Sequence, residues 1–419
     1  MREMKDSGIE WVGAIPQAWK MNTIAQIFLQ VKCKNTGLQE KNLLSLSYGK
    51  VKRKSIDTVE GLLPESFDGY NIIEKDDIVL RLTDLQNDHT SLRVGLAEER
   101  GIITSAYLTI RNRSNFCPKY LYYYLHSFDI AKGFYGMGAG VRQGLNWDGV
   151  KWLKILAPSV PEQERIAAFL DAECAEIDAV LEKIRASIEE YKKLKQAVIT
   201  QAVTKGIRGD RPMKNSGIEW IGTCPLNWTV CRIKNVIFPQ EKEVLPDDEI
   251  ITCFRDGEVT LRKNRREDGF TVSFTEHGYH GVDKGDLVIH GMDAFAGAIG
   301  CSDSRGKTTP VVHTCKTAGN NRFFMYFLRS MAYGNILMDL SNGVRIRSSD
   351  FRNFAKLGVF GAVMPPLEEQ NEIVDYIDEI VIQMDRLIQK KENLLTEIEN
   401  YKKSLIYEYV TGKKEVLPL

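Results

Sequence analysis

The chain has 419 residues, of which 43% are hydrophobic, and its 56 Lys and Arg balance its 56 Asp and Glu. This length allows about two or three domains, and a net charge of zero does not exclude a polyanionic partner, because opposite charges can be segregated. The N-terminal stretch lacks the apolar core of a signal peptide, no apolar run is long enough to span a bilayer, and the eight cysteines form no CxxC pair, so we expect a cytoplasmic protein with reduced thiols.

Two stretches are nearly identical, KDSGIEWVG from Lys5 to Gly13 and KNSGIEWIG from Lys214 to Gly222. Further matched segments follow in the same order: Pro16 and Trp19 with Pro225 and Trp228, KDDIVL (75–80) with KGDLVI (284–289), KYLYYYLHS (119–127) with RFFMYFLRS (322–330), PEQERI (161–166) with LEEQNEI (367–373), and AVTKG (202–206) with YVTGK (409–413). The sequence therefore predicts a tandem duplication with a period of roughly 205 to 209 residues, which suits a domain plus a connector.

The first part of each half, residues 21–156 and 230–363, mixes short β-branched and aromatic runs with Gly, Asn and Asp turns. This composition is typical of mixed α/β structure.

From Pro161 the pattern changes to a long helix that has no internal Gly or Pro and is acidic in its first turn, as the helix dipole prefers. Apolar residues recur at alternating steps of four and three, which is a coiled-coil heptad. The predicted seam residues of this helix are Leu170, Cys174, Ile177, Leu181, Ile184, Ile188, Tyr191, Val198 and Ala202.

The same register in the second half predicts the seam residues Ile377, Val381, Met384, Ile388, Leu395, Ile398, Leu405 and Tyr409. Lys391 and Lys402 interrupt this seam, and Lys195 occupies the position equivalent to Lys402 in the first helix. A helix of about 40 residues is roughly 60 Å long and cannot bury its apolar stripe alone. We expect an antiparallel pair of helices; the alternative is that each stripe packs on its own globular half.

This order of segments resembles the specificity subunit of type I restriction-modification systems, and the resemblance covers nearly the whole chain. It rests on a variable globular region, a P-x-x-E-Q-x-x-I type of helix start and a heptad helix ending near AVTKG or YVTGK, all repeated after SGIEW. The fold class that it implies is α+β: two similar mixed α/β target recognition domains joined by two long antiparallel coiled-coil helices, with a pseudo-two-fold internal repeat.

The resemblance also implies a division into four parts. Residues 1–157 would form the first recognition domain with an N-terminal segment at 5–20, and residues 158–206 the central spacer helix. Residues 207–364 would form the second recognition domain with the repeated segment at 214–229, and residues 365–419 the C-terminal spacer helix.

In such a family the chain is non-catalytic, each domain reads one half of an asymmetric bipartite site on double-stranded DNA, and the helices set the spacing. Two methyltransferase subunits would dock and bring S-adenosylmethionine, and restriction subunits would bring ATP and Mg²⁺. Apolar residues outside the seam predict a partner surface on the helices, namely Phe169, Val180, Ile380 and Leu387.

The charge pattern points to nucleic acid once it is localised. The helix from Glu162 is rich in carboxylates, which leaves the globular parts relatively basic. Phosphate contacts need Lys and Arg, and base reading needs Arg, Lys, Asn or Gln at a groove. The candidate DNA-binding residues are Lys50, Lys52, Arg53, Lys54, Arg142, Gln143, Arg262, Lys263, Arg265, Arg266, Arg345 and Arg347. Each basic run is equally compatible with a solvated charged strand or loop.

Catalytic and metal motifs are weak. The stretch GCSDSRGKT (300–308) has one residue too many between its glycines for a phosphate-binding loop, and the His277 and His280 pair lacks a convincing second pair for a metal. A non-catalytic role follows. The alternative function is a coiled-coil assembly adaptor that binds proteins and no nucleic acid.

Overall fold

The computed structural model describes residues 2–55, 66–137, 144–265, 277–338 and 353–417. Its contacts divide the chain into two compact units, unit 1 (Met1–Arg185 with Asn393–Leu419) and unit 2 (Ala186–Glu392). The boundary between them lies within both long helices. The four-part division of the sequence therefore stays a prediction.

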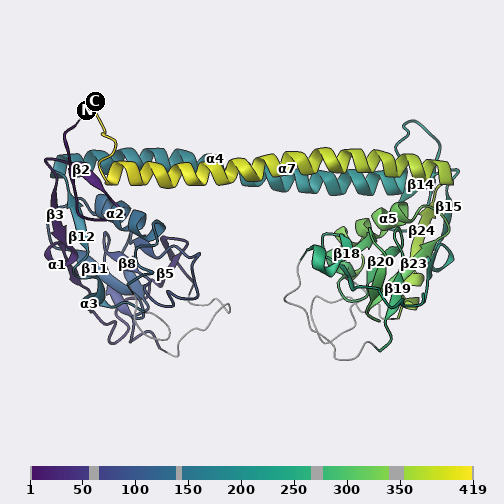
Figure 1. The fold of residues 1–419 in the computed structure, drawn as a ribbon, viewed down its shortest axis with the longest axis horizontal. Helices are drawn as coiled ribbons and strands as arrows, with labels where there is room; N and C mark the ends of the chain where they lie inside the picture. Colours follow the sequence, from purple (N-terminus) through teal and green to yellow (C-terminus); the bar gives the residue numbers. More distant parts are fainter. Residues whose placement is uncertain (1, 56–65, 138–143, 266–276, 339–352, 418–419) are drawn as a thin grey trace. The chain divides into compact units, whose positions relative to one another are not determined.

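Unit 1 alternates short strands with three short or medium helices before the first long helix (Figure 1). Its elements are β1 (Met4–Asp6), β2 (Ala14–Pro16), β3 (Lys20–Thr23), α1 (Ile24–Ile27), β4 (Phe28–Gln30), β5 (Leu44–Ser47), β6 (Lys50–Arg53), β7 (Asn71–Ile73), β8 (Ile78–Leu80), β9 (Val94–Leu96), β10 (Gly101–Ile103), β11 (Leu108–Asn112), α2 (Pro118–Ile130), α3 (Trp147–Val150), β12 (Lys154–Ala157) and the start of α4 (Val160–Lys205).

Unit 2 repeats this order with 3-10 turns in place of some helical turns. Its elements are β13 (Met213–Asn215), β14 (Thr223–Pro225), β15 (Thr229–Arg232), η1 (Ile233–Asn235), β16 (Ile237–Pro239), β17 (Ile251–Cys253), β18 (Val259–Leu261), η2 (Arg262–Asn264), β19 (His280–Val282), β20 (Leu287–His290), η3 (Ala294–Ala296), β21 (Ile299–Cys301), β22 (Gly306–Thr308), β23 (Val312–Thr317), α5 (Asn321–Tyr333), α6 (Ala355–Gly358), β24 (Gly361–Met364) and the start of α7 (Leu367–Val410).

Each sheet of unit 1 described by the structure has a counterpart in unit 2. The four-stranded sheet has the order β4-β11-β8-β9 in unit 1 and β16-β23-β20-β21 in unit 2. The two-stranded pairs β1-β2, β12-β3, β5-β6 and β10-β7 correspond to β13-β14, β15-β24, β17-β18 and β19-β22. All these pairings are antiparallel. The predicted tandem repeat and the α+β fold class are confirmed.

The cores of the two units are built from equivalent elements. In each unit a medium helix, α2 or α5, lies between the four-stranded sheet and the long helices (Figure 1). Trp19 is buried in the first core and Trp228 in the second. The end of α7, with Leu405 and Val410, completes the core of unit 1, and the end of α4, with Val203, completes that of unit 2.

Within each unit the long helices run antiparallel. In unit 1, Asp178 of α4 pairs with Lys402 of α7 at 2.5 Å, and Arg185 pairs with Glu399 at 2.6 Å. In unit 2, Lys195 pairs with Asp385 at 2.6 Å. Residue numbers rise along α4 as they fall along α7, which is the predicted direction of pairing.

All the predicted seam residues are buried or half-buried. The buried ones are Leu170, Cys174, Leu181, Ile184, Ile188, Ala202, Ile377, Ile388 and Leu405, and the half-buried ones are Ile177, Tyr191, Val198, Val381, Met384, Leu395, Ile398 and Tyr409. The lysines that interrupt the seam have partners: Lys402 has Asp178, and the Lys391 ammonium lies 5.5 Å from the centre of the Tyr191 ring.

All eight cysteines are free thiols. Among the described helices, none combines the length and the apolar character that a membrane crossing requires.

Candidate nucleic-acid interface

The hairpin of β5 and β6 in unit 1 carries the first basic run, Lys50 to Lys54. Its two turn residues, Tyr48 and Gly49, have φ of 49° and 75°, as a two-residue hairpin turn with matching twist requires. Side chains alternate between the faces of a strand, so Lys50 and Lys52 share one face of β6 and Arg53 lies on the other.

The two faces have different environments. Lys50 and Lys52 line a groove against α4 and α7, where the Lys50 ammonium is 3.7 Å from Asp178. Arg53 instead donates from Nε to Glu99 at 2.6 Å and from its terminal nitrogen to the second oxygen of the same carboxylate. Lys54 is half-buried just after the strand. The lysines and Arg53 of this basic run therefore face different environments, and Glu99 balances the charge of Arg53.

The second basic run lies beside a polar recess of about 690 Å³ in unit 2. Arg262 and Arg265 line this recess, and Lys263 does not. The other side chains that line it include Phe254, Arg255, Asp256, His290, Asp293, Thr308 and Thr309. β17, the turn after it and η2 supply one side, and the ends of β20 and β22 supply the other. Hydrogen-bond donors dominate this surface.

The arginines of the recess are held by carboxylates and an aromatic ring. The Arg265 guanidinium lies 4.2 Å from the centre of the Phe254 ring and pairs with Asp256 at 2.6 Å. Arg255 pairs with Asp293 at 3.0 Å. Such contacts fix a guanidinium before a ligand arrives, which lowers the entropy cost of binding.

His290 is held in one tautomer. Its Nδ1 accepts hydrogen bonds from the backbone N–H groups of Met292 at 3.3 Å and Asp293 at 3.1 Å. Nδ1 therefore carries no proton, and the neutral ring has its proton on Nε2. Burial lowers the pKa of His290 below its ordinary value, which favours this neutral form. The recess gains a fixed N–H donor.

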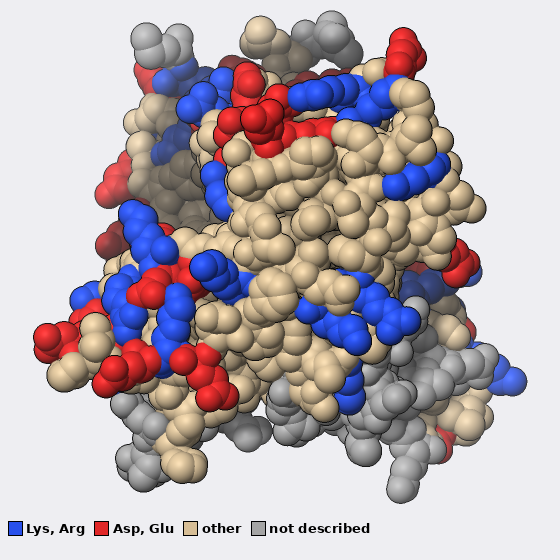
Figure 2. All heavy atoms as spheres, turned by 90° about the vertical axis from the view of Figure 1, so that its right-hand side faces the viewer, with Lys and Arg blue, Asp and Glu red and all other residues tan. Residues whose placement is uncertain are grey.

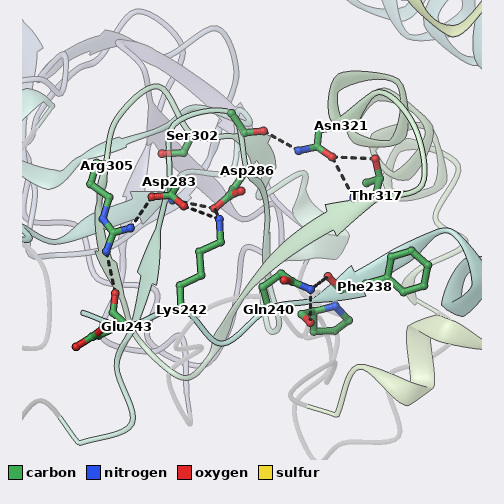
Figure 3. A network of polar contacts seen from close by, with 12 residues as sticks. Phe238, Gln240, Lys242, Glu243, Asp283, Asp286, Ser302, Arg305, Thr317 and Asn321 are labelled. Carbon is green, nitrogen blue, oxygen red and sulfur yellow. Dashed lines mark hydrogen bonds and ion pairs between the residues drawn. The ribbon is translucent and has the colours of Figure 1, made fainter. Parts of the chain in front are cut away.

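A network of ion pairs anchors the strands that lead to the recess (Figure 3). The Lys242 ammonium lies between Asp283 at 2.7 Å and Asp286 at 2.6 Å. Arg305 bonds Asp283 and also pairs with Asp248 at 2.9 Å. Arg305 immediately precedes β22, and Asp248 comes shortly before β17. The network thus fixes the starts of two strands that line the recess.

Five of the sequence candidates, Arg142, Gln143, Arg266, Arg345 and Arg347, lie outside the described residues. Lys263 pairs with Glu249 at 2.5 Å. Sequence reasoning missed Arg255 and His290 because it searched for dense basic runs, and these residues stand singly in different segments. Arg255 comes shortly after β17 and His290 is the last residue of β20, so their common position in the recess depends on tertiary structure that the repeat does not indicate.

The expected partner surface on the helices is only partly exposed. Val180 and Leu387 have 44% and 41% of their surface exposed. Phe169, however, packs against Tyr409 with ring centroids 4.5 Å apart, and Ile380 is half-buried. Phe169 and Ile380 are therefore less exposed than Val180 and Leu387. The heptad pattern did not indicate that the ring of Tyr409 would cover Phe169.

Unit 2 also exposes large apolar side chains, one of them on β15 at the edge that carries β14 and β15 (Figure 1). Viewed from that side, the described surface has a broad area without charged side chains, and Lys and Arg are mixed with Asp and Glu below it (Figure 2). Val230 of β15, Phe238 of β16 and Val359 after α6 are exposed. Their counterparts in unit 1, Met21, Leu29 and Trp152, are exposed as well.

A solved structure with a similar fold comes from a type I restriction-modification system. It is described as "Structural basis underlying complex assembly and conformational transition of the type I R-M system"; it is 15% identical, the match covers 96% of this chain and 99% of that chain, and the TM-score is 0.67. The chain has the fold of that type I restriction-modification chain. No protein-family model matches it.

Two further similar structures are S subunits of type I restriction-modification systems by name. One is the HsdS subunit from Thermoanaerobacter tengcongensis, at 15% identity, 98% and 100% coverage and a TM-score of 0.48. The other is the S subunit from M. genitalium, at 15% identity, 93% and 96% coverage and a TM-score of 0.37. The type I restriction-modification fold of this chain rests on the first structure, whose match spans nearly the full length of both chains.

Proposed function

We propose that this chain is the DNA sequence-specificity subunit of a type I restriction-modification complex. The observation that carries the proposal is the shared fold over nearly the whole length of both chains, at a TM-score of 0.67. The duplicated unit supports it, because two similar readers suit a site with two halves. Outside the matched segments the globular parts of the two units differ in sequence, so the half-sites should differ and the target should be asymmetric.

In this role the chain performs no chemistry. Methylation and cleavage belong to partners: two methyltransferase subunits with S-adenosylmethionine, and restriction subunits with ATP and Mg²⁺, in the cytoplasm. Exposed Val180 and Leu387 on the helices, and the apolar positions repeated at the edges of both units, are where we expect partner subunits to dock. The long helices would set the length of the unread gap.

The competing candidate, an assembly adaptor without nucleic-acid binding, is favoured by those same apolar surfaces. A mobility-shift titration of the chain, co-expressed with its methyltransferase subunits, separates the two functions. A DNA reader loses affinity steeply with salt, by roughly one logarithmic unit of slope for each phosphate neutralised. An adaptor gives no salt-dependent shift with any duplex.

A domain exchange tests the modular part of the proposal. Residues 21–156 would be replaced by the equivalent part of another specificity subunit, and methylated sites would be mapped in a host carrying the complex. One half of the recognised site should change and the other should stay. A simultaneous change in both halves would contradict the assignment of one half-site to each unit.

A further inference from the structure

The lysine-lined groove of unit 1 lies between the β5–β6 hairpin and the long helices. It comprises a cavity of about 560 Å³ and a neighbouring one of about 330 Å³. Lys50, His126, Asp178, Lys402 and Ile406 line both, so the two cavities adjoin. This groove includes residues of the long helices, none of which was among the predicted DNA-binding residues.

Positive charge exceeds negative charge in the larger cavity. The cationic side chains that line it are Lys50, Lys52, Lys132, Arg185, Lys402 and Lys403, and the carboxylates are Asp178 and Glu399. Asp178 is shared by Lys402 at 2.5 Å and Lys50 at 3.7 Å, and Glu399 pairs with Arg185 at 2.6 Å. Both carboxylates are thus already engaged.

The remaining three lysines have no carboxylate partner among the described residues. Lys132 donates to the carbonyl oxygen of His89, and Lys403 donates to the side-chain oxygen of Asn400 at 3.2 Å. For Lys52 the structure gives no polar partner in the described part of the chain. These ammonium groups retain donors for an anion, since each carries three N–H bonds.

His126 supplies a second, independent sign of a ligand. Its side chain is 9% exposed and stacks on the Tyr122 ring with centroids 5.5 Å apart. Its Nδ1 is buried and has no hydrogen-bond partner among the described residues. Buried polar atoms are nearly always paired, so the unpaired Nδ1 of a residue that lines both cavities points to a polar group in this groove.

The repeat shows that the shared scaffold does not require these cations. Strand pairing places Leu46 opposite Val51 in unit 1 and Cys253 opposite Val259 in unit 2. On this register the equivalents of Lys50 and Lys52 are Glu258 and Thr260. On the helices, the segments that match 207 residues apart give Glu392 for Arg185 and Gln196 for Lys403. Unit 2 has lost or never had this excess of positive charge.

We infer that the groove of unit 1 is a binding site for phosphate groups, with Lys52, Lys132 and Lys403 as the principal ligands. Lysine ammonium groups bind phosphate oxygens through charge-assisted hydrogen bonds, about twice as strong as neutral ones. The phosphates belong either to the backbone of a nucleic acid or to a free phosphate compound. Phosphate binding in this groove does not require that either unit reads bases, because contacts between lysines and phosphates carry no sequence information.

The test compares full-length variants with matched loss of charge. The double variant Lys52→Ala, Lys403→Ala removes two groove ammonium groups, and Lys52→Arg, Lys403→Arg keeps the charge. The control Lys183→Ala, Lys193→Ala removes two exposed lysines of α4 that do not line the groove. Circular dichroism checks that all variants are folded. Calorimetry with inorganic pyrophosphate measures binding of a free phosphate compound. A salt series of mobility shifts with duplex DNA measures binding of backbone phosphates.

If the source is a free phosphate compound, pyrophosphate binds the parent protein. Its affinity falls at least about tenfold in the alanine variant and recovers in the arginine variant. If the source is the backbone, the salt slope of DNA binding falls by about 2 in the alanine variant, with no change in the control. The inference is wrong if neither readout responds, or if the control loses as much. Pyrophosphate binding without DNA binding would overturn the proposed function and leave this site standing.

Discussion

The indole N–H of Trp228 donates a hydrogen bond of 3.1 Å to Oε2 of Glu369, the third residue of α7. In unit 1, Trp19 makes the same bond of 3.1 Å to Glu162, the third residue of α4. Each glutamate also pairs with an arginine, Arg211 for Glu369 and Arg2 for Glu162. The segment that follows SGIEW therefore fastens the globular part to the start of its long helix.

The two junctions differ in burial, which leads to the first prediction. Glu369 is 3% exposed, whereas Arg2 is more open than Arg211 and keeps Glu415 as a second partner at 2.7 Å. Breaking a buried ion pair costs about 3 to 5 kcal/mol, and an exposed one costs less than about 1 kcal/mol. We expect Glu369→Gln to lower the free energy of unfolding by about 3 kcal/mol and Glu162→Gln by about 1 kcal/mol. Urea denaturation of both variants measures this, and equal losses would contradict it.

Much of this architecture was predictable from sequence because the two halves of the chain can be aligned with each other. The duplication, the helix starts and the seam follow from residue patterns, and even the seam lysines recur at Lys195 and Lys402. The environment of single charges was not predictable. Arg53 is neutralised by Glu99, a residue far along the chain, and His290 acquires its role from backbone N–H groups of the next turn. Such pairings depend on tertiary structure that no local pattern contains.

The second prediction concerns two buried groups of α2 with opposite effects. Burial raises the pKa of Asp129 to about 6. Folded Asp129 therefore binds its proton more tightly than unfolded Asp129, and its contribution to stability falls as the pH rises from about 4 to 6. Burial, and secondarily Lys402, lowers the pKa of His126 to about 4. Its contribution is complete above its ordinary pKa of about 6.5 and is lost as the pH falls toward 4.

These two contributions nearly cancel in the intact chain, and single variants should reveal them. A shift of about two pKa units corresponds to about 3 kcal/mol. Relative to the parent, Asp129→Asn should gain about 3 kcal/mol of unfolding free energy between pH 4 and 6, and His126→Phe should lose a similar amount. Urea denaturation across this range provides the measurement. Curves parallel to that of the parent would show that neither pKa is shifted.

The third prediction addresses the ion pair in the seam of unit 2. Lys195 is 25% exposed at a heptad position that is otherwise apolar, and its partner Asp385 is more open to solvent. The pair contributes less than about 1 kcal/mol, whereas burial of an apolar side chain contributes about 1.5 kcal/mol or more. Lys195→Met should therefore raise the free energy of unfolding by about 1 kcal/mol. The exposed control Lys192→Met should leave it unchanged, and a loss at Lys195 would mean that the ion pair fixes the helix register.

The last prediction separates base reading from phosphate binding within the proposed function. Arg255 and His290 present fixed donors to the recess of unit 2, which suits the acceptor edge of a guanine, and one good contact to a base is worth about 1 to 3 kcal/mol. Arg255→Ala and His290→Phe should each relax discrimination at one position of one half-site by about 5- to 150-fold. Lys52→Ala should instead weaken all sequences alike, because phosphates are the same at every base. Selection from a randomised duplex library by the complete complex gives both readouts. If the recess variants keep the same base preference but bind all duplexes more weakly, the recess contacts the DNA backbone and does not read bases.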